Sequence, residues 1–169
     1  MASPTPDASD LHIDALLPVE MARKAEAIGV KKATAPTLEL LALAILAGAF
    51  IALGGLFATI AGSGAAGIMS YGVTRLLMGL VFCLGLILVV VGGAELFTGN
   101  NLIVMAWASG KVSSVAMLRN WTLVFLGNFI GAALTALLVV ASGHYTFGNG
   151  AIGQMIFAIA AGKLHYSFV

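Results

Sequence analysis

The feature that most constrains the fold of this chain is a long apolar segment with polar residues inside it. The segment runs for 36 residues from Val73 to Ala108, and it contains Glu95 and the run Thr98-Gly99-Asn100-Asn101. One straight helix of this length would extend about 54 Å, well beyond a hydrocarbon core of about 30 Å. Non-helical backbone at that depth is tolerated only inside protein or beside a water-filled path. The sequence therefore predicts two half-helices, residues 73–94 and 101–109, joined by a loop inside the protein.

Composition indicates that the bilayer is the main solvent of the chain. Hydrophobic residues make up 60% of the sequence and charged residues 9%, whereas soluble domains carry about a quarter charged residues. The formal net charge of +1 and the absence of a basic patch argue against a nucleic-acid partner. The sequence contains no nucleophile–base pair, metal-ligand cluster or phosphate-binding loop, so we expect neither an enzyme nor a bound metal or cofactor.

The hydropathy pattern divides the chain into three parts. Residues 1–16 are rich in Ser, Pro and Asp and are expected to be flexible, and residues 17–35 are expected to form a cytoplasmic amphipathic helix and linker. This helix either lies on the membrane surface or packs on its own channel domain. Residues 36–169 are expected to form a transmembrane half-domain, with further spans at 38–60 and 118–142. Residues 151–161 are too short to cross and are expected to be re-entrant or interfacial.

Basic residues give the expected orientation. Six of them precede the first span or lie between the second and third, and two lie on the opposite side (Arg23, Lys24, Lys31, Lys32, Lys111 and Arg119 against Arg75 and Lys163). By the positive-inside rule, the N-terminus is then in the cytoplasm and the protein is a multi-pass protein of the cytoplasmic (inner) membrane.

The break in the second segment has electrostatic consequences. The second half-helix is expected to present free N–H groups near Asn100 and Asn101, where anions are favoured. Glu95 either accepts hydrogen bonds from loop N–H groups or relays protons, and the first interpretation is preferred because orphan donors are close in sequence. In the third span, Gly127 and Gly131 have the GxxxG spacing of close helix packing. Asn128, between them, is expected to form a hydrogen bond across a helix interface.

Three separated motifs resemble the formate/nitrite transporter family, and most of all its formate channels. They are Val90-Val91-Gly92-Gly93-Ala94-Glu95-Leu96-Phe97-Thr98-Gly99, Gly127-Asn128-Phe129-Ile130-Gly131-Ala132 and Leu17-Pro18-Val19-Glu20-Met21-Ala22. The resemblance covers about residues 12–169. It implies an all-α membrane protein with an aquaporin-like helical bundle, built as two inverted repeats of three spans, and a homopentamer with one pore in each subunit.

The same resemblance implies roles for individual residues. It implies pore-constriction positions at Phe82, Leu86, Leu96 and Phe97. It implies a gating loop that contains Glu95, Thr98, Gly99, Asn100 and Asn101, and it implies that Lys163 draws anions toward the pore. From the residues alone, Phe82 and Leu86 share one helix face and are more simply explained as lipid-facing or packing residues. The resemblance reverses that preference.

The sequence stops where a fourth span is expected, so we expect it to be the N-terminal half of such a channel, with three spans, the second one broken. The expected function is transport of small monovalent anions across the membrane, formate first, with nitrite and hydrosulfide as alternatives. The alternative is a truncated membrane scaffold or assembly subunit that transports nothing.

Overall fold

Three long apolar helices form the body of the protein. The computed structural model describes residues 16–164, and all regular elements within that range are helical. They are α1 (Pro18–Ala33), α2 (Thr37–Gly62), α3 (Tyr71–Val91), α4 (Phe97–Asn100), α5 (Ile103–Ala108), α6 (Ser114–Ala141), a 3₁₀ turn (His144–Thr146) and α7 (Ala151–Leu164). Within the described range, α2, α3 and α6 are long and apolar enough to span a membrane. The predicted all-α membrane fold with three spans is confirmed.

Glycines allow α2 to lie directly against its two neighbours. A Cβ atom built at Gly131 of α6 would lie 1.9 Å from the carbonyl oxygen of Ile45, and one at Gly48 of α2 would lie 2.1 Å from that of Asn128. On the other side of α2, a Cβ at Gly54 would lie 3.0 Å from Cα of Gly85 in α3. Backbones this close confirm the predicted close packing at the GxxxG spacing and place α2 at the centre of the three spans.

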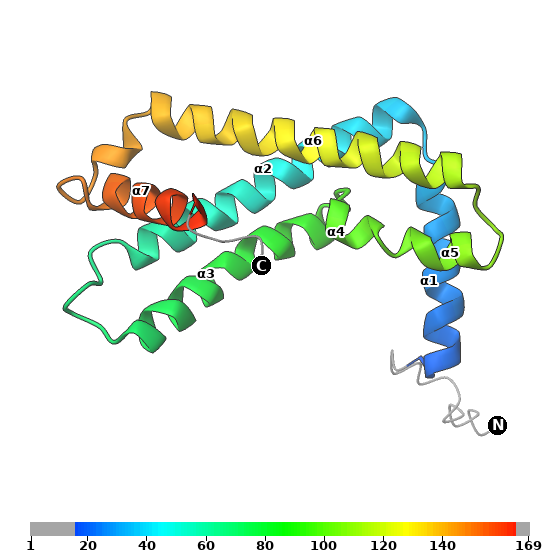
Figure 1. The fold of residues 1–169 in the computed structure, drawn as a ribbon, viewed down its shortest axis with the longest axis horizontal. Coiled ribbons are helices and arrows are strands. Elements are labelled where there is room, and N and C mark those ends of the chain that lie inside the picture. The colour runs from blue at the N-terminus through cyan, green and yellow to red at the C-terminus, as the bar shows by residue number, and fades with distance from the viewer. Residues whose placement is uncertain (1–15, 165–169) are drawn as a thin grey trace, which may run out of the picture.

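The helix α1 lies across one end of the spans and α7 lies at the other end, beside α2 (Figure 1). Gly29 and Ala33 of α1 are buried against Ile103 and Ala106 of α5. A helix is therefore present where one was expected near residues 17–30. Of the two alternatives, a helix on the membrane surface or one packed on its own channel domain, the structure shows the second. The flexible N-terminus predicted for residues 1–16 lies, apart from Leu16, outside the described residues.

Two helix boundaries differ from the predicted ones. The helix α6 begins at Ser114, four residues before the predicted start at Leu118, because the side chain of Ser113 caps it by accepting from the N–H of Ala116 at 3.2 Å. The helix α7 extends to Leu164 and has 14 residues. The described part of α7 is about 21 Å long.

Candidate functional site

The second span breaks at a pair of glycines. The helix α3 ends at Val91, and Gly93 has a left-handed φ of 60°. The N–H of Ala94 donates to the carbonyl of Val89 at 2.9 Å, and that of Gly93 donates to Val90 at 3.3 Å. These two bonds form a Schellman motif, which ends a helix by satisfying its last carbonyls. The break therefore lies at residues 92–96, just before the polar run that predicted it.

The helical backbone resumes at Phe97, so the predicted start at Asn101 is wrong. The N–H groups of Asn100 and Asn101 donate to the carbonyls of Leu96 at 3.0 Å and Phe97 at 3.2 Å, as in a helix. They are not the free donors that the sequence led us to expect. The N–H of Phe97 donates to Oδ1 of Asn128 in α6 at 2.9 Å. A side chain from another helix thus caps the second half of the broken span.

Asn128 fixes the loop between two spans. Its Nδ2 donates to the carbonyl of Ala44 in α2 at 2.8 Å and to the carbonyl of Glu95 at 2.9 Å. The N–H of Glu95 donates to the carbonyl of Leu43 at 3.1 Å. The predicted hydrogen bond from Asn128 across a helix interface is confirmed. The sequence did not indicate that the same side chain would also hold the loop.

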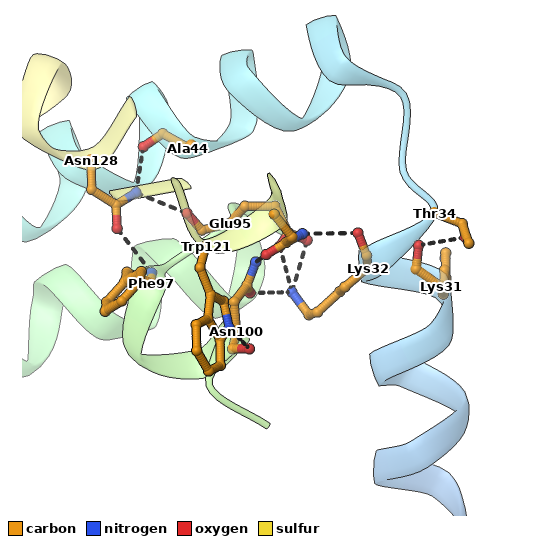
Figure 2. A network of polar contacts seen from close by, with 10 residues as sticks. Lys31, Lys32, Thr34, Ala44, Glu95, Phe97, Asn100, Trp121 and Asn128 are labelled. Carbon is orange, nitrogen blue, oxygen red and sulfur yellow. Dashed lines mark hydrogen bonds and ion pairs between the residues drawn. The ribbon is translucent and has the colours of Figure 1, made fainter. Parts of the chain in front are cut away.

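The carboxylate of Glu95 binds a lysine of α1 (Figure 2). Nζ of Lys32 lies 2.8 Å from Oε1 and 2.7 Å from Oε2, and Nδ2 of Asn100 donates to Oε2 at 2.7 Å. The side chains of Lys32 and Glu95 are 25% and 14% exposed. Glu95 was expected to accept from loop N–H groups, and in the described contacts its carboxylate accepts from side chains instead. The ion pair lowers the cost of a carboxylate at this depth.

Asn100 and Asn120 extend this polar cluster into the interior, and both are fully buried. Nδ2 of Asn100 donates to Oδ1 of Asn120 at 2.9 Å, and Nδ2 of Asn120 donates to the carbonyl of Lys32 at 2.9 Å. Nζ of Lys32 also donates to Oδ1 of Asn100 at 3.0 Å. Nε1 of Trp121 donates to the backbone carbonyl of Asn100 at 3.0 Å. Lys32 and Asn120 were missed as site residues. Asn120 could have been predicted as a site residue, because an amide side chain inside an apolar span needs a polar partner.

An open pocket of about 470 Å³ lies beside the break. Five of the nine residues predicted for the pore and the gating loop line it (Leu86, Leu96, Thr98, Gly99 and Asn100). Phe82 is on the same face of α3 one turn before Leu86, and the two side chains are 41% and 52% exposed. The pocket is thus apolar on its α3 side and polar where Thr98, Asn100 and Lys32 reach it.

Three other predicted site residues, Phe97, Asn101 and Lys163, do not line this pocket. The ring of Phe97 packs edge-on against α6, with its centroid 5.5 Å from that of Phe125 and 6.5 Å from that of Trp121. Asn101 is exposed beyond the first turn of the resumed helix. Lys163 lies in the last turn of α7, a helix that begins at the end of the bundle opposite α1 and runs back toward the middle (Figure 1).

A second ionic contact joins α1 to the turn after α5. The carboxylate of Glu26 accepts hydrogen bonds from Nζ of Lys111 and Oγ of Ser109. The Lys111 contact, followed by the Ser109 hydroxyl, holds the pKa of Glu26 below its ordinary value of 4.5. Together with the Lys32–Glu95 pair, this contact ties the surface helix α1 to both ends of the resumed half-span.

Acidification is expected to loosen α1 from α5. Because the pKa of Glu26 is lowered in the fold, its contribution is fully present above pH 4.5 and is lost as pH falls through the lowered value. The protection factors of the α1 amides, which correct for the slower intrinsic exchange in acid, should therefore fall on acidification below pH 4.5 in the wild type. Glu26→Gln should show fast exchange already at neutral pH, whereas the matched control Glu20→Gln should follow the wild type. Equal α1 exchange in wild type and Glu26→Gln at neutral pH would contradict this assignment.

Comparison with known proteins identifies the family. The sequence profile of the formate/nitrite transporter family matches residues 19–169. The chain belongs to this family. It is 44% identical over 161 residues to the formate channel FocA of Escherichia coli strain K12, covering 95% of this chain and 56% of that protein. It is 40% identical over 154 residues to the formate channel FocA of Haemophilus influenzae, covering 91% of this chain and 54% of that protein.

Solved structures agree with this assignment. A pentameric formate channel with formate bound superposes with a TM-score of 0.73 at 43% identity, covering 78% of this chain and 51% of that one. An ion channel of the same family superposes with a TM-score of 0.66 at 27% identity. The chain spans about half the length of the curated relatives it matches. These relatives are membrane channels, so the family member described here is a membrane protein of a channel family and not of an enzyme family.

Proposed function

We propose that this family member forms part of a transmembrane channel for small monovalent anions, with formate as the first substrate and nitrite and hydrosulfide as alternatives. The observation that carries the proposal is the broken second span, whose loop is held inside the protein and borders an open pocket. The similarity to formate channels supports formate as the first choice.

The pocket has the chemistry of a dehydrating constriction. Leu86 and Leu96 supply apolar walls and Thr98 supplies a hydroxyl beside them. An apolar constriction rejects hydrated cations, because nothing there replaces their water. A bare anion is also costly to bury, so a weak acid passes more easily once it is protonated. Phe82, one turn before Leu86 on α3, extends the constriction on the same face.

The loop at the break acts as the gate in this proposal. Thr98 and Gly99 border the pocket, while Glu95 and Asn100 hold the loop to α1 through Lys32. Asn101 continues the loop into the resumed half-span. A gate needs a fixed position in its closed state, and the ion pair and the Asn128 hydrogen bonds provide one.

The proposed assembly is a homopentamer in the cytoplasmic membrane with the N-terminus in the cytoplasm. The excess of basic residues at the α1 end supports the orientation. The pentameric state of the superposed formate channel supports the assembly. In this orientation Lys163 lies on the outer side and raises the local concentration of anions at the pore entrance.

Flux measurements test this function. The whole protein in liposomes should take up labelled formate faster than empty liposomes, and nitrite and hydrosulfide uptake rank the alternatives. Lys163→Glu should slow formate entry about tenfold, because it replaces an attractive charge by a repulsive one. Lys31→Glu, at the opposite end, is the matched control and should leave entry from the outer side unchanged. Uptake no faster than in empty liposomes would favour the scaffold or assembly subunit instead.

A further inference from the structure

The acidic side chains are distributed very unevenly along the sequence. All seven acidic residues lie within residues 7–39 or at Glu95, and the sequence contains none in residues 40–94 or 96–169. The end opposite α1, here called the far end, carries the loops at residues 63–70 and 142–150 (Figure 1). Arg75, in the second turn of α3, lies at this end. Among the described residues, a cation at this end with no acidic side chain near it in the sequence attracts anions.

Arg75 lies on the approach to the proposed constriction. It is in the second turn of α3, seven residues before Phe82 and eleven before Leu86. Positions seven and eleven apart fall on one face of a helix, because two turns take about 7.2 residues. The guanidinium is therefore on the face of α3 that carries the constriction residues, nearer the far end.

A pocket of about 350 Å³ surrounds this arginine. Arg75 and Tyr71 line one wall, and Met78, Met155 and Ile159 are among the apolar residues of the others. The guanidinium carbon lies 5.1 Å from the centroid of the Tyr71 ring, which is cation–π distance. Lys163 follows Ile159 by four residues on α7 and so shares the α7 face that lines the pocket.

We propose that Arg75, stacked on Tyr71, holds a small monovalent oxyanion such as a monocarboxylate in this pocket before it reaches Phe82. A guanidinium whose face lies over a ring leaves its edge N–H groups available, and these groups match a carboxylate in pairs. No acidic side chain of residues 40–94 or 96–169 competes for them, because the sequence has no Asp or Glu there. The proposal deepens the channel function proposed above and rests on it for its physiological meaning.

The first experiment measures entry as a function of external formate. In the whole protein, Arg75→Gln should raise the formate concentration that gives half-maximal entry by about fivefold, while the maximal rate stays near that of the wild type. Arg75→Lys should recover part of the change, since it restores the charge without the paired donors. Lys31→Gln, with the same charge change at the opposite end, should match the wild type. A half-maximal concentration unchanged in Arg75→Gln would overturn the proposal.

The second experiment detects binding without transport. Phenylglyoxal modifies exposed arginines, and the chain has three, Arg23, Arg75 and Arg119. Formate should slow modification of Arg75 but not that of Arg23, as read by peptide mass mapping, and Tyr71→Leu should weaken this protection while Tyr71→Phe keeps it. Protection in a protein that conducts nothing would support the site and overturn the channel function. Conduction with no protection would overturn the site and leave the channel function standing.

A lipid phosphate has the same chemistry as the proposed oxyanion, so the lipid is varied as well. Protection of Arg75 by formate is expected in detergent and in phosphatidylcholine liposomes alike. If phosphatidylglycerol protects Arg75 and formate adds nothing to the protection in any lipid, the pocket binds lipid head groups, and the proposed oxyanion site is overturned.

Discussion

Replacing Lys32 with methionine is expected to destabilise the protein by about 3 kcal/mol, because the Glu95 carboxylate would remain in the interior without its cation. The ammonium contacts both carboxylate oxygens and Asn100. The expected result is a clear fall in the thermal unfolding midpoint in detergent. Lys31→Met is the matched control: its side chain is exposed beside Lys32 on α1, and a change within about 0.5 kcal/mol is expected.

The double variant Lys32→Met/Glu95→Leu separates loss of the pair from loss of the fold. Removing both charges should restore much of the stability, since the largest cost in the single variant is the uncompensated carboxylate. Its gate is nevertheless expected to be less well held, because α1 then has no ionic link to the loop. A Lys32→Met protein as stable as the wild type, or a double variant less stable than the single one, would rule out this account of the pair.

The Lys32–Glu95 pair makes the position of α1 and the conformation of the loop depend on each other. Glu95 is held at its backbone by Leu43 and Asn128 and at its carboxylate by Lys32. Moving α1 away therefore requires the pair to break or the loop to follow. The Glu26 contact to Lys111 restrains the same helix from the other end of the resumed half-span. Coupling of this kind needs a continuous set of contacts, and here each contact is identified.

Length and polarity predicted the spans and the break, because a 36-residue apolar segment cannot cross a bilayer as one helix. They did not predict where the break lies. The polar run at Thr98–Asn101 predicted a break too late in the sequence. The stronger local signal is Gly92-Gly93, where α3 ends in a Schellman motif. Polar residues mark where solvation is difficult, whereas glycines mark where the backbone turns.

The Lys32–Glu95 ion pair could not be predicted from the sequence, for a different reason. Lys32 and Glu95 are 63 residues apart and belong to a surface helix and a buried loop. No local pattern connects them, so Lys32 was counted only as a positive charge on the cytoplasmic side. Glu95 was paired by inference with the nearest donors in sequence, the loop N–H groups. The tertiary contact between α1 and α5 brings a better donor, and charge-assisted hydrogen bonds then decide the arrangement.

Replacing Asn128 with leucine is expected to destabilise the protein about as much as Lys32→Met does. The cause is the loss of hydrogen bonds to backbone groups, not the loss of a charge. The amide satisfies three of them, the N–H of Phe97 and the carbonyls of Ala44 and Glu95. An unsatisfied buried polar group costs about 1–3 kcal/mol. A loss of at least about 3 kcal/mol is therefore expected.

The loss from Asn128→Leu should appear first at the loop. Hydrogen exchange of residues 93–98 should accelerate strongly, whereas the amides of α2 and α3 should lose less protection. Thr135→Val is the matched control, because the Thr135 hydroxyl donates its hydrogen bond within α6, to the carbonyl of Gly131. Its loop should exchange as in the wild type. Uniform loss of protection across all three spans in Asn128→Leu would show instead that Asn128 holds the helices together and that the loop is fixed by other contacts.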